Sequence, residues 1–508
     1  MNKKWILLLL LTIVASTAWF IQPNSKPTTL AISGPFEFNS QDMSKDGFLF
    51  SRLQVVEALV GINENAEPFP LLAKSWTQSQ DGLTWRFAIR DNIKFHDDTP
   101  LTALSVVESL RAAKSKPGVM RHVPVATIFA ENNDVVITLT KPYRPLTSVL
   151  AHYTTAIVTN IDQNEAGIKI AGTGPYQVKE LTPPHKATVS RYEDYWKEKA
   201  KIDQVSYLAG HRTESRTLLA QSGQADIVYT VDPVSMANLQ QADNLKLHVE
   251  SMPRTVLIKL NNEHKFLNHA DIRKALSLAI DRDGIANSVL RLPGSQAYQL
   301  FSPALGAWHA DNLPASHRGL SEAQALMSSQ GWELNSEQLL EKNGEIFKIQ
   351  LVTYSDRPEL PLIATALQAQ LRELGVDMQI SIDNSSAVPA KHHDGTLEMA
   401  LIARNFGTLA DPLPLLMRDF ATKKGSGWGP TNWESAEFTQ ILNQLSSEMD
   451  QQHYRELSTK AAQLLANEMP LIPITYYRQL VAVNNRVSDF TFDPFEINYR
   501  ISEMQLDD

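Results

Sequence analysis

Hydrophobic and polar positions alternate along this chain with two different periods. Every second position of Thr84–Ile89 is apolar, which predicts a strand with one buried face. The turn dipeptide Asp81-Gly82 precedes this strand, so Ser75–Ile89 is predicted to form a β-hairpin with that dipeptide at its tip. In Asp271–Ile280 the apolar residues recur every three or four positions, which predicts an amphipathic helix.

The same patterns extend over the rest of the chain. They predict strands over Thr28–Ser33, Asp134–Leu139, Tyr176–Val178, Val205–Leu208, Ile227–Tyr229, Thr255–Leu260, Phe347–Val352, Met378–Ile382 and Leu471–Tyr477. Helices are predicted over Leu53–Val60, Ala103–Ala113, Ser321–Ser329, Leu360–Leu374 and Arg455–Glu468, and a loop over Ala390–Gly395. This alternation indicates an α/β protein. Because no repeat or Pro/Ser-rich linker divides the chain, we expect interleaved domains with several crossings between them.

The N-terminus has the pattern of an export signal. Lys3 and Lys4 precede the apolar run Trp5–Ile21, and small residues stand near its end, with cleavage predicted after Ala18. An uncleaved membrane anchor is the alternative, because the run is almost long enough to span a bilayer. With either reading of residues 1–21, the rest of the chain is expected to be exported to the periplasm.

Composition excludes several classes of function. The chain has 508 residues, of which 43% are hydrophobic and 20% charged, enough for a large core. A formal charge of −9 disfavours nucleic-acid binding, which needs a basic face. The absence of cysteine excludes disulfides, thiolate metal sites, a cysteine nucleophile and a lipid anchor on cysteine.

Catalytic motifs are absent. There is no His-Glu-x-x-His, no Gly-x-Ser-x-Gly and no P-loop, so a periplasmic hydrolase is only a remote alternative. Gly172-Thr173-Gly174 precedes a strand instead of opening a helix, which favours a tight turn over a phosphate cradle. His392 and His393 form the one adjacent histidine pair, and with His122 they are the candidates for a metal ligand; a solvated turn is the alternative for the pair.

An ordered series of motifs resembles the family 5 extracellular solute-binding proteins, which serve oligopeptide, dipeptide and nickel ABC importers. The matching segments are Pro70–Trp76, Asp81–Phe87, Ile89–Phe95, Gly172–Tyr176, Tyr192–Trp196, Gly223–Ile227, Leu260–Asn262 and Ile272–Arg282. The resemblance implies a two-lobed periplasmic binding protein of type II, cluster C-like, with hinge strands and an extra subdomain in lobe 1. It implies lobe 1 over residues 28–250 with the subdomain at about 53–170, lobe 2 over 251–472, and a return to lobe 1 over 473–508.

The resemblance also implies a function without catalysis. A small solute would bind in the cleft between the lobes, the lobes would close over it, and a permease with its ATPase subunits would receive it from a monomeric binding protein. The amino-acid sequence of the matching segments resembles the nickel-binding branch most. The implied ligand is therefore nickel or a metal chelate, carried as cargo and not as a cofactor. A di- or oligopeptide is the alternative. A regulator using this fold is excluded, because an export signal stands where its DNA-binding helices would be.

Candidate ligand-binding residues follow from the nickel branch, in which two arginines hold the carboxylates of a chelator and one histidine completes the metal shell. Arg121 matches the first arginine, but no arginine stands near Thr154–Ile157, where the second falls. Lys424 falls near the histidine position, and Phe406 replaces a tryptophan of the aromatic wall. Arg404 is a further cationic candidate, with a surface salt bridge as the alternative, and Trp428 belongs to a group of aromatic residues that suits a pocket wall. In the peptide branch an Asp holds the ammonium group, and Thr408 stands at that position here, with Asp411 nearby.

Overall fold

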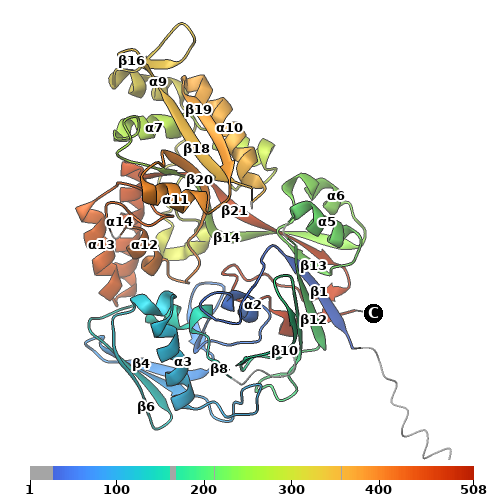
Figure 1. Cartoon of the computed structure of the whole chain (residues 1–508). Coiled ribbons are helices and arrows are strands. Elements are labelled where there is room, and N and C mark those ends of the chain that lie inside the picture. The colour runs from blue at the N-terminus through green and yellow to red at the C-terminus, as the bar shows by residue number, and fades with distance from the viewer. Residues whose placement is uncertain (1–26, 161–166, 211, 356, 421, 508) are drawn as a thin grey trace, which may run out of the picture.

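The computed structural model describes residues 27–507 apart from 161–166, 211, 356 and 421. The predicted signal peptide or anchor at residues 1–21 lies outside the described residues. Within the described residues, no helix combines the length and the apolar character that crossing a membrane requires. Figure 1 shows one body above and one below, with two long strands running between them.

A ten-stranded mixed sheet connects the two bodies. Its order is β10-β11-β12-β1-β13-β21-β14-β20-β18-β19. Two central strands, β14 (Leu245–Leu260) and β21 (Leu471–Asn484), pair antiparallel from Leu245 opposite Asn484 to Lys259 opposite Leu471. Their ladder is interrupted between Ser251 and Thr255 and again between Val256 and Leu257. Since one half of each strand belongs to each body, these strands are the hinge connection that the resemblance implied.

Lobe 1 is the body built on the first five strands of the sheet order. These are β10 (Tyr176–Thr182), β11 (Lys186–Arg191), β12 (Gln204–Ala209), β1 (Thr29–Gly34) and β13 (Ile227–Tyr229). Strand β1 pairs in parallel with β12 on one side and with β13 on the other. The lobe 1 core also contains residues from 481–504, so the C-terminal segment packs back on the lobe in which the chain began.

The subdomain is a small body with its own core, drawn from residues 59–171 together with Leu409. Its four strands lie in the order β4 (Ala73–Gln78), β5 (Thr84–Ile89), β7 (Asp134–Leu139) and β6 (Val125–Glu131). Helix α3 (Ala103–Ser115) lies beside this sheet, and the Thr102 hydroxyl accepts a hydrogen bond from the Ser105 amide in a capping box at its start (Figure 1). The short helix α4 (Leu146–Leu150) and the 3₁₀ turns η1 (Val119–His122) and η2 (Tyr153–Thr155) complete the connection to lobe 1.

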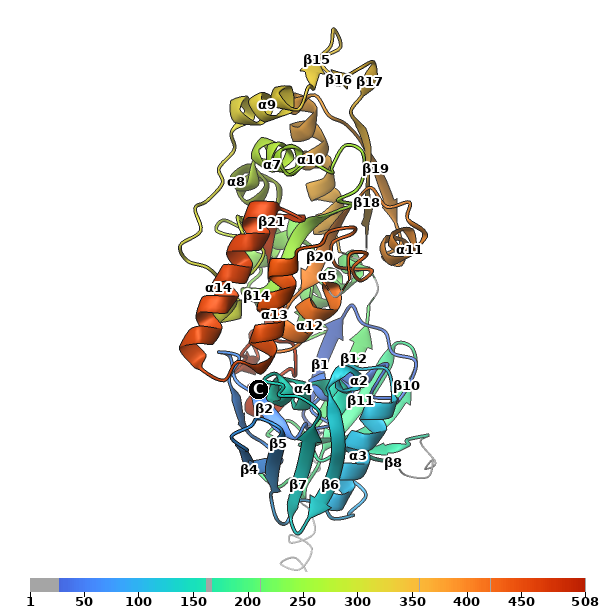
Figure 2. The ribbon, with the colours of Figure 1, turned by 90° about the vertical axis from the view of Figure 1, so that its left-hand side faces the viewer.

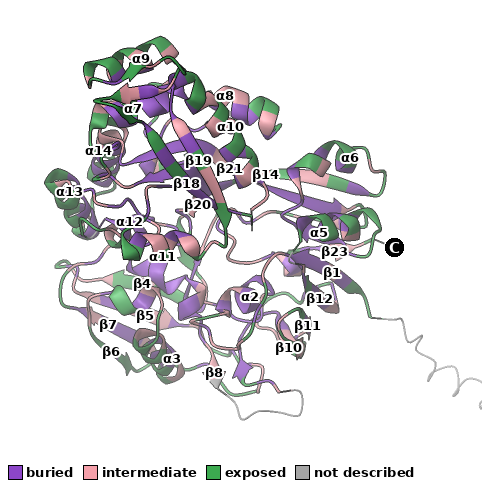
Figure 3. Cartoon of the chain, turned by 45° about the horizontal axis from the view of Figure 1, so that its top comes forward, coloured by how far each residue is buried: buried purple, intermediate pink, exposed green. Residues whose placement is uncertain are grey.

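Lobe 2 is built on β20 (Met399–Asn405), β18 (Lys348–Tyr354) and β19 (Asp377–Asp383), which extend the sheet from β14. Its main helices are α7 (Ala270–Ala279), α9 (Leu320–Ser329), α10 (Glu359–Leu374), α11 (Ala387–Asp394), α12 (Leu413–Asp419), α13 (Ala436–Ser447) and α14 (Gln451–Glu468). Figure 3 shows green, exposed residues along the outward faces of α9 and α13, while β18 and β20 are mostly buried. Helix α10 packs directly on β18, β19 and β20, while α9 packs on α7 and α13 packs on α14.

Most predicted elements are confirmed by the structure. The hairpin is formed by β4 and β5, with Trp76 opposite Phe87, and the predicted bounds of β7 and β13 match those observed. Two predictions were wrong. The segment predicted as a helix over Leu53–Val60 follows a short helix, α2 (Gly47–Arg52), because Gln54 adopts a φ of 54° that ends the helix. The segment predicted as a loop at Ala390–Gly395 belongs to helix α11, which ends at Gly395 in the left-handed conformation.

The glycine-rich motif allows two backbone segments to approach closely. A Cβ on Gly172 or Gly174 would lie 2.1 or 2.0 Å from the carbonyl oxygens of Val55 and Gln54. Nearby, the buried carboxylate of Glu57 accepts hydrogen bonds from Thr173, Tyr195 and Trp196, which belong to two of the sequence motifs, at 2.9 Å each. These motif residues therefore bind each other and hold the scaffold together.

Candidate functional site

A cavity of about 80 Å³ lies where lobe 1, lobe 2 and the C-terminal segment meet. Three separate parts of the sequence line most of it. They are Phe48 and Arg52 of α2 with Ser148 and Ala151–Tyr153 around α4, then Asn405 and Gly407–Ala410 at the end of β20, and finally Phe495–Ile497. Because the two lobes supply opposite walls, relative movement of the lobes changes the size of this site.

A tight loop forms the lobe 2 wall. The amides of Phe406 and Gly407 both donate to the carbonyl of Pro253, at 2.8 and 3.1 Å. A Cβ on Gly407 would lie 2.0 Å from Pro253 Cγ, so only glycine fits this position without displacement. The Asn405 carboxamide oxygen accepts from the Gly407 amide at 2.9 Å, which pins the loop against β14.

An arginine pair bridged by one carboxylate lies beside the cavity. Glu496 contacts Arg52 of lobe 1 at 3.3 Å and Arg254 of β14 at 2.8 Å. Burial opposes ionisation of Glu496, but the guanidinium groups of Arg254 and Arg52 outweigh it and lower the pKa of this carboxyl. Glu496 adopts a φ of 53°, an uncommon conformation for a residue with a side chain. The C-terminal segment thus places an ionised carboxylate between the lobes.

A third arginine extends this cluster. Arg254 lies over the Tyr477 ring at 4.8 Å, and Arg357 lies over the same ring at 5.1 Å and donates to its hydroxyl. Besides Glu496, the cluster contains the carboxyl group of Glu359, whose pKa is raised by burial. The guanidinium groups of Arg52 and Arg254 therefore share the one carboxylate of Glu496, and the excess positive charge of this trio favours an anion over a cation.

On the lobe 1 side, His152 and Tyr153 line the cavity next to Arg52. The His152 ring stacks against Tyr153 with centroids 4.1 Å apart, and its Nδ1 accepts a hydrogen bond from the Thr154 amide. Burial lowers the pKa of His152 to about 3, so the imidazole is neutral at physiological pH.

Arg144 joins the subdomain to lobe 2 near this cavity. Its amide donates to the Ser446 carbonyl at the end of α13, and its guanidinium donates to the Glu448 carbonyl and the Gln451 side chain. It also lies over the Tyr454 ring at 4.2 Å. Figure 2 shows the lower ends of α13 and α14 reaching down towards α4, which begins two residues after Arg144.

Thr408, at the position of the peptide branch's Asp, lines the cavity, whereas the five residues predicted from the sequence to bind ligand lie outside the lining. Arg121 and His122 are exposed in the turn η1 of the subdomain. Phe406 stands between two lining residues, but it is buried and packs edge-to-face against Phe301 in lobe 2. Lys424 is exposed and donates to the carbonyl of His393.

The other predicted residues gather in lobe 2. Arg404 donates from Nε and Nη2 to the same oxygen, Oδ2, of the buried Asp419 at 2.9 and 2.5 Å, so its salt bridge lies in the interior and not on the surface. Half-buried Trp428 meets the Tyr354 ring edge-on. His392 is buried with Nδ1 at 3.0 Å from the Lys259 ammonium, while the neighbouring His393 is exposed.

Sequence reasoning missed Arg52, His152, Arg254 and Glu496. One signal was available for Arg254, because two cations, Arg254 and Lys259, interrupt the largely apolar stretch of β14 from Met252 to Leu260, and both are buried. A charged residue in such a run is seldom buried without a partner.

No group of three or more His, Asp or Glu side chains among the described residues is arranged to hold a metal ion.

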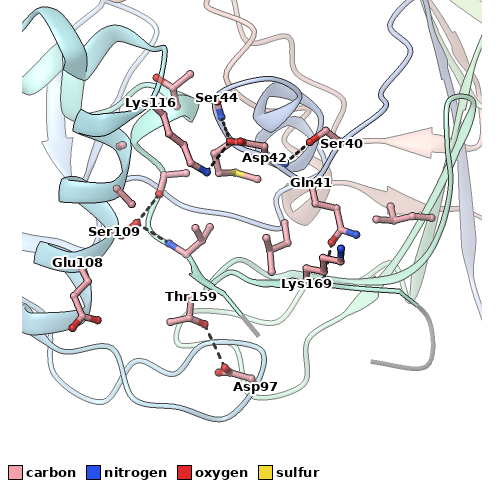
Figure 4. Close-up of a pocket in the computed structure, with 18 of the residues that line it drawn as sticks. Ser40, Gln41, Asp42, Ser44, Asp97, Glu108, Ser109, Lys116, Thr159 and Lys169 are labelled. Carbon is pink, nitrogen blue, oxygen red and sulfur yellow. Dashed lines mark hydrogen bonds and ion pairs between the residues drawn. The ribbon is translucent and has the colours of Figure 1, made fainter. Parts of the chain in front are cut away.

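A larger cavity, of about 1040 Å³, lies within lobe 1 and the subdomain (Figure 4). Its described lining comes from residues 38–183, with none from lobe 2. Its polar groups pair with one another, since Lys116 meets Asp42 at 3.1 Å and Gln41 donates to the Gly167 carbonyl. Closure of the lobes would not enclose this cavity.

Comparison with known proteins identifies the family. Residues 67–427 match the model of the bacterial extracellular solute-binding proteins, family 5, middle region. The chain belongs to this family. Members bind small solutes outside the cell membrane and work with the permease and ATPase subunits of ABC importers, so this protein is a substrate-binding protein of an importer and not an enzyme.

Two relatives and one solved structure show the range of similar proteins. The nickel-binding protein NikA of Staphylococcus aureus is 26% identical over 454 residues, covering 88% of this chain and 89% of its own length. The oligopeptide-binding protein OppA of Bacillus subtilis is 25% identical, covering 94% and 95%. The crystal structure of Brucella suis NikA in complex with Fe(III)-EDTA superposes with a TM-score of 0.84 at 21% identity, covering 94% of this chain and all of that one. The two-lobed α/β fold predicted from the sequence is confirmed.

Proposed function

We propose that this protein captures a small metal chelate bearing carboxylates, with nickel as the leading metal, and delivers it to its importer. The observation that carries the proposal is the interlobe cavity beside Arg52 and Arg254, where arginines outnumber carboxylates. Arginine suits this role because its planar fork binds carboxylate oxygens in pairs.

Two further points support a chelate over a bare ion. The described residues hold no metal-binding cluster, so the chelator has to supply most of the metal ligands. The relatives include a nickel-binding protein, and a structural neighbour was crystallised with a metal held by EDTA, a polycarboxylate.

An oligopeptide is the second candidate, because a peptide-binding relative covers the chain as fully as the nickel-binding one. A free acidic group near the cavity would favour it, since a peptide carries an ammonium group. Asp411 is the acidic residue in the adjoining loop, but both its oxygens accept from the Tyr454 hydroxyl, at 2.8 and 2.7 Å. This carboxylate is therefore already engaged, which favours the chelate.

We further propose that the protein is a monomer in the periplasm, exported by the segment at residues 1–21, and that its lobes have the bounds predicted from the sequence. The Escherichia coli relative is a nickel-binding periplasmic protein, which supports this location.

Thermal unfolding tests the proposed cargo. A ligand that binds the folded state raises stability by about 2.7 kcal/mol at a hundredfold excess over its dissociation constant. We expect stabilisation by nickel mixed with histidine or with citrate, and little by nickel or chelator alone. Stabilisation by a peptide mixture but by no metal chelate would overturn the proposal. Native mass spectrometry of protein purified from the periplasm would identify a retained ligand directly.

A further inference from the structure

His152 is held in one tautomer by its own turn. The backbone amide of Thr154 donates to His152 Nδ1 at 3.2 Å, and the Thr154 hydroxyl lies 2.9 Å from the same atom. A backbone N–H can only donate, so Nδ1 has to be an acceptor without a proton. The neutral ring therefore carries its proton on Nε2.

That Nε2–H group has no hydrogen-bond partner among the described residues, although the atom is buried. The whole residue is 7% exposed, in a position that lines the interlobe cavity beside Arg52. A buried donor without an acceptor costs about 1–3 kcal/mol. An acceptor that enters between the lobes would recover this free energy.

Nearby protein acceptors are engaged elsewhere. The Asn405 carboxamide oxygen accepts from the Gly407 amide, and the Glu496 carboxylate lies between two arginines. An acceptor on the cargo can therefore supply the partner that His152 Nε2 lacks among the described residues.

We propose that His152 is a specificity-determining residue that donates its Nε2–H to a carboxylate or carbonyl oxygen of the cargo, and that it is not a metal ligand. The proposal rests on the proposed function in one respect, namely that the cargo binds in the interlobe cavity. With the guanidinium of Arg52, this donor makes the lobe 1 wall selective for oxygen acceptors.

The tautomer opposes metal coordination through Nε2. Imidazole binds a metal through the lone pair of an unprotonated nitrogen. Here the free lone pair is on Nδ1, which faces the Thr154 amide, and Nε2 carries hydrogen. Coordination through Nε2 would move the proton to Nδ1, where it would oppose another N–H donor.

The first test reads the tautomer by NMR. Protein labelled with ¹⁵N-histidine is compared with His152→Ala, so that the difference spectrum assigns the ring. We expect a proton coupled to Nε2 in the protein without ligand, and its retention, with a changed shift, when the zinc complex of histidine binds. Zinc is used because it is diamagnetic. A proton on Nδ1, or loss of the Nε2 proton on binding, would overturn the proposal.

The second test measures affinity by calorimetry for nickel–histidine, nickel–citrate and a peptide mixture. Replacing His152 by alanine should weaken the ligand that binds by about 5- to 30-fold, the equivalent of a lost hydrogen bond of about 1–2 kcal/mol. His152→Gln, which keeps an N–H donor, should recover part of this loss. His185→Ala changes an exposed histidine between β10 and β11 and should have no effect.

The outcomes separate the two proposals. If wild-type protein binds peptides and no chelate, the proposed cargo is wrong, and a weaker peptide affinity of His152→Ala would still support His152 as a donor. Unchanged affinity of His152→Ala for whichever ligand binds would refute the role of His152. Circular dichroism of each variant confirms that it is folded.

Discussion

Arg144→Ala should release the subdomain from lobe 2 without disturbing either core. The side chain crosses from the subdomain to the end of α13, where it donates to the Glu448 carbonyl at 2.8 Å and to the Gln451 side chain at 2.5 Å. These hydrogen bonds exist only while the subdomain and lobe 2 are together. Removing them therefore changes the equilibrium between closed and open lobes and leaves the fold of each body intact.

The size of the effect follows from the hydrogen bonds and the ring interaction that the Arg144 side chain makes. Hydrogen bonds from a charged donor contribute about 1.5–3 kcal/mol each when buried, and a cation–π interaction such as that with Tyr454 about 0.5–1 kcal/mol at an exposed site. Arg144 is only half-buried, and its amide still reaches Ser446 in the variant, so we expect a net loss of about 2 kcal/mol. This loss corresponds to about a 30-fold shift towards the open lobes. Arg144→Lys keeps the charge but loses the planar fork, so a smaller shift is expected.

Single-molecule fluorescence can measure this shift. Because the chain has no cysteine, dyes can be attached at Ser115→Cys on α3 and Gln440→Cys on α13, both exposed. Arg111→Ala is the matched control, since Arg111 donates to the Ile128 carbonyl within the subdomain and should leave the distance distribution unchanged. An unaltered distribution in Arg144→Ala, or an equal shift in Arg111→Ala, would refute the reasoning.

Three further predictions concern stability. Burial lowers the pKa of Lys259 to about 7, so the unfolded chain binds more protons than the folded chain between pH 7 and 10. In urea titrations, the free energy of unfolding of the wild type should therefore rise by about 2 kcal/mol from pH 7 to 9 relative to Lys259→Met. The same pH dependence in both proteins would contradict this prediction. Gly407→Ala should lower the free energy of unfolding by about 1–3 kcal/mol, because the alanine Cβ would overlap Pro253. An unchanged urea midpoint would contradict this, since it would mean that the loop moves away from Pro253 without cost. Asp419→Ala leaves the guanidinium of Arg404 buried without its partner and should cost about 3–5 kcal/mol, and a loss below about 1 kcal/mol would mean that water solvates it.

Most of the secondary structure was predictable because it is encoded locally. The alternation in Thr84–Ile89 and the helical period of Asp271–Ile280 each reflect one buried face, and both elements formed as predicted. The prediction failed at Leu53–Val60, whose apolar residues are buried without forming a helix. There the backbone turns at Gln54 and packs against Gly172 and Gly174, far along the chain, and no local pattern records that packing.

The family was also predictable, because its ordered motifs lie in the scaffold. Glu57 and the motif residues Thr173 and Trp196 hold one another in place wherever the cargo binds. For the same reason, these motifs carry no information about the ligand. Arg121 and Lys424, predicted by matching ligand positions of the nickel branch, are exposed at sites away from the interlobe cavity.

The sequence by itself determined an α/β scaffold and membership of a binding-protein family, since both depend on short-range periodicity or motif order, and it predicts an export signal at residues 1–21. Only the tertiary structure decided which side chains meet between the lobes. Arg52, His152 and Glu496 are separated by up to 444 residues, and they meet because β14 and β21 connect the two bodies and the C-terminal segment returns to α2. Electrostatic and hydrogen-bonding interactions depend on distance in space, so the chemistry of the site could emerge only from the folded chain.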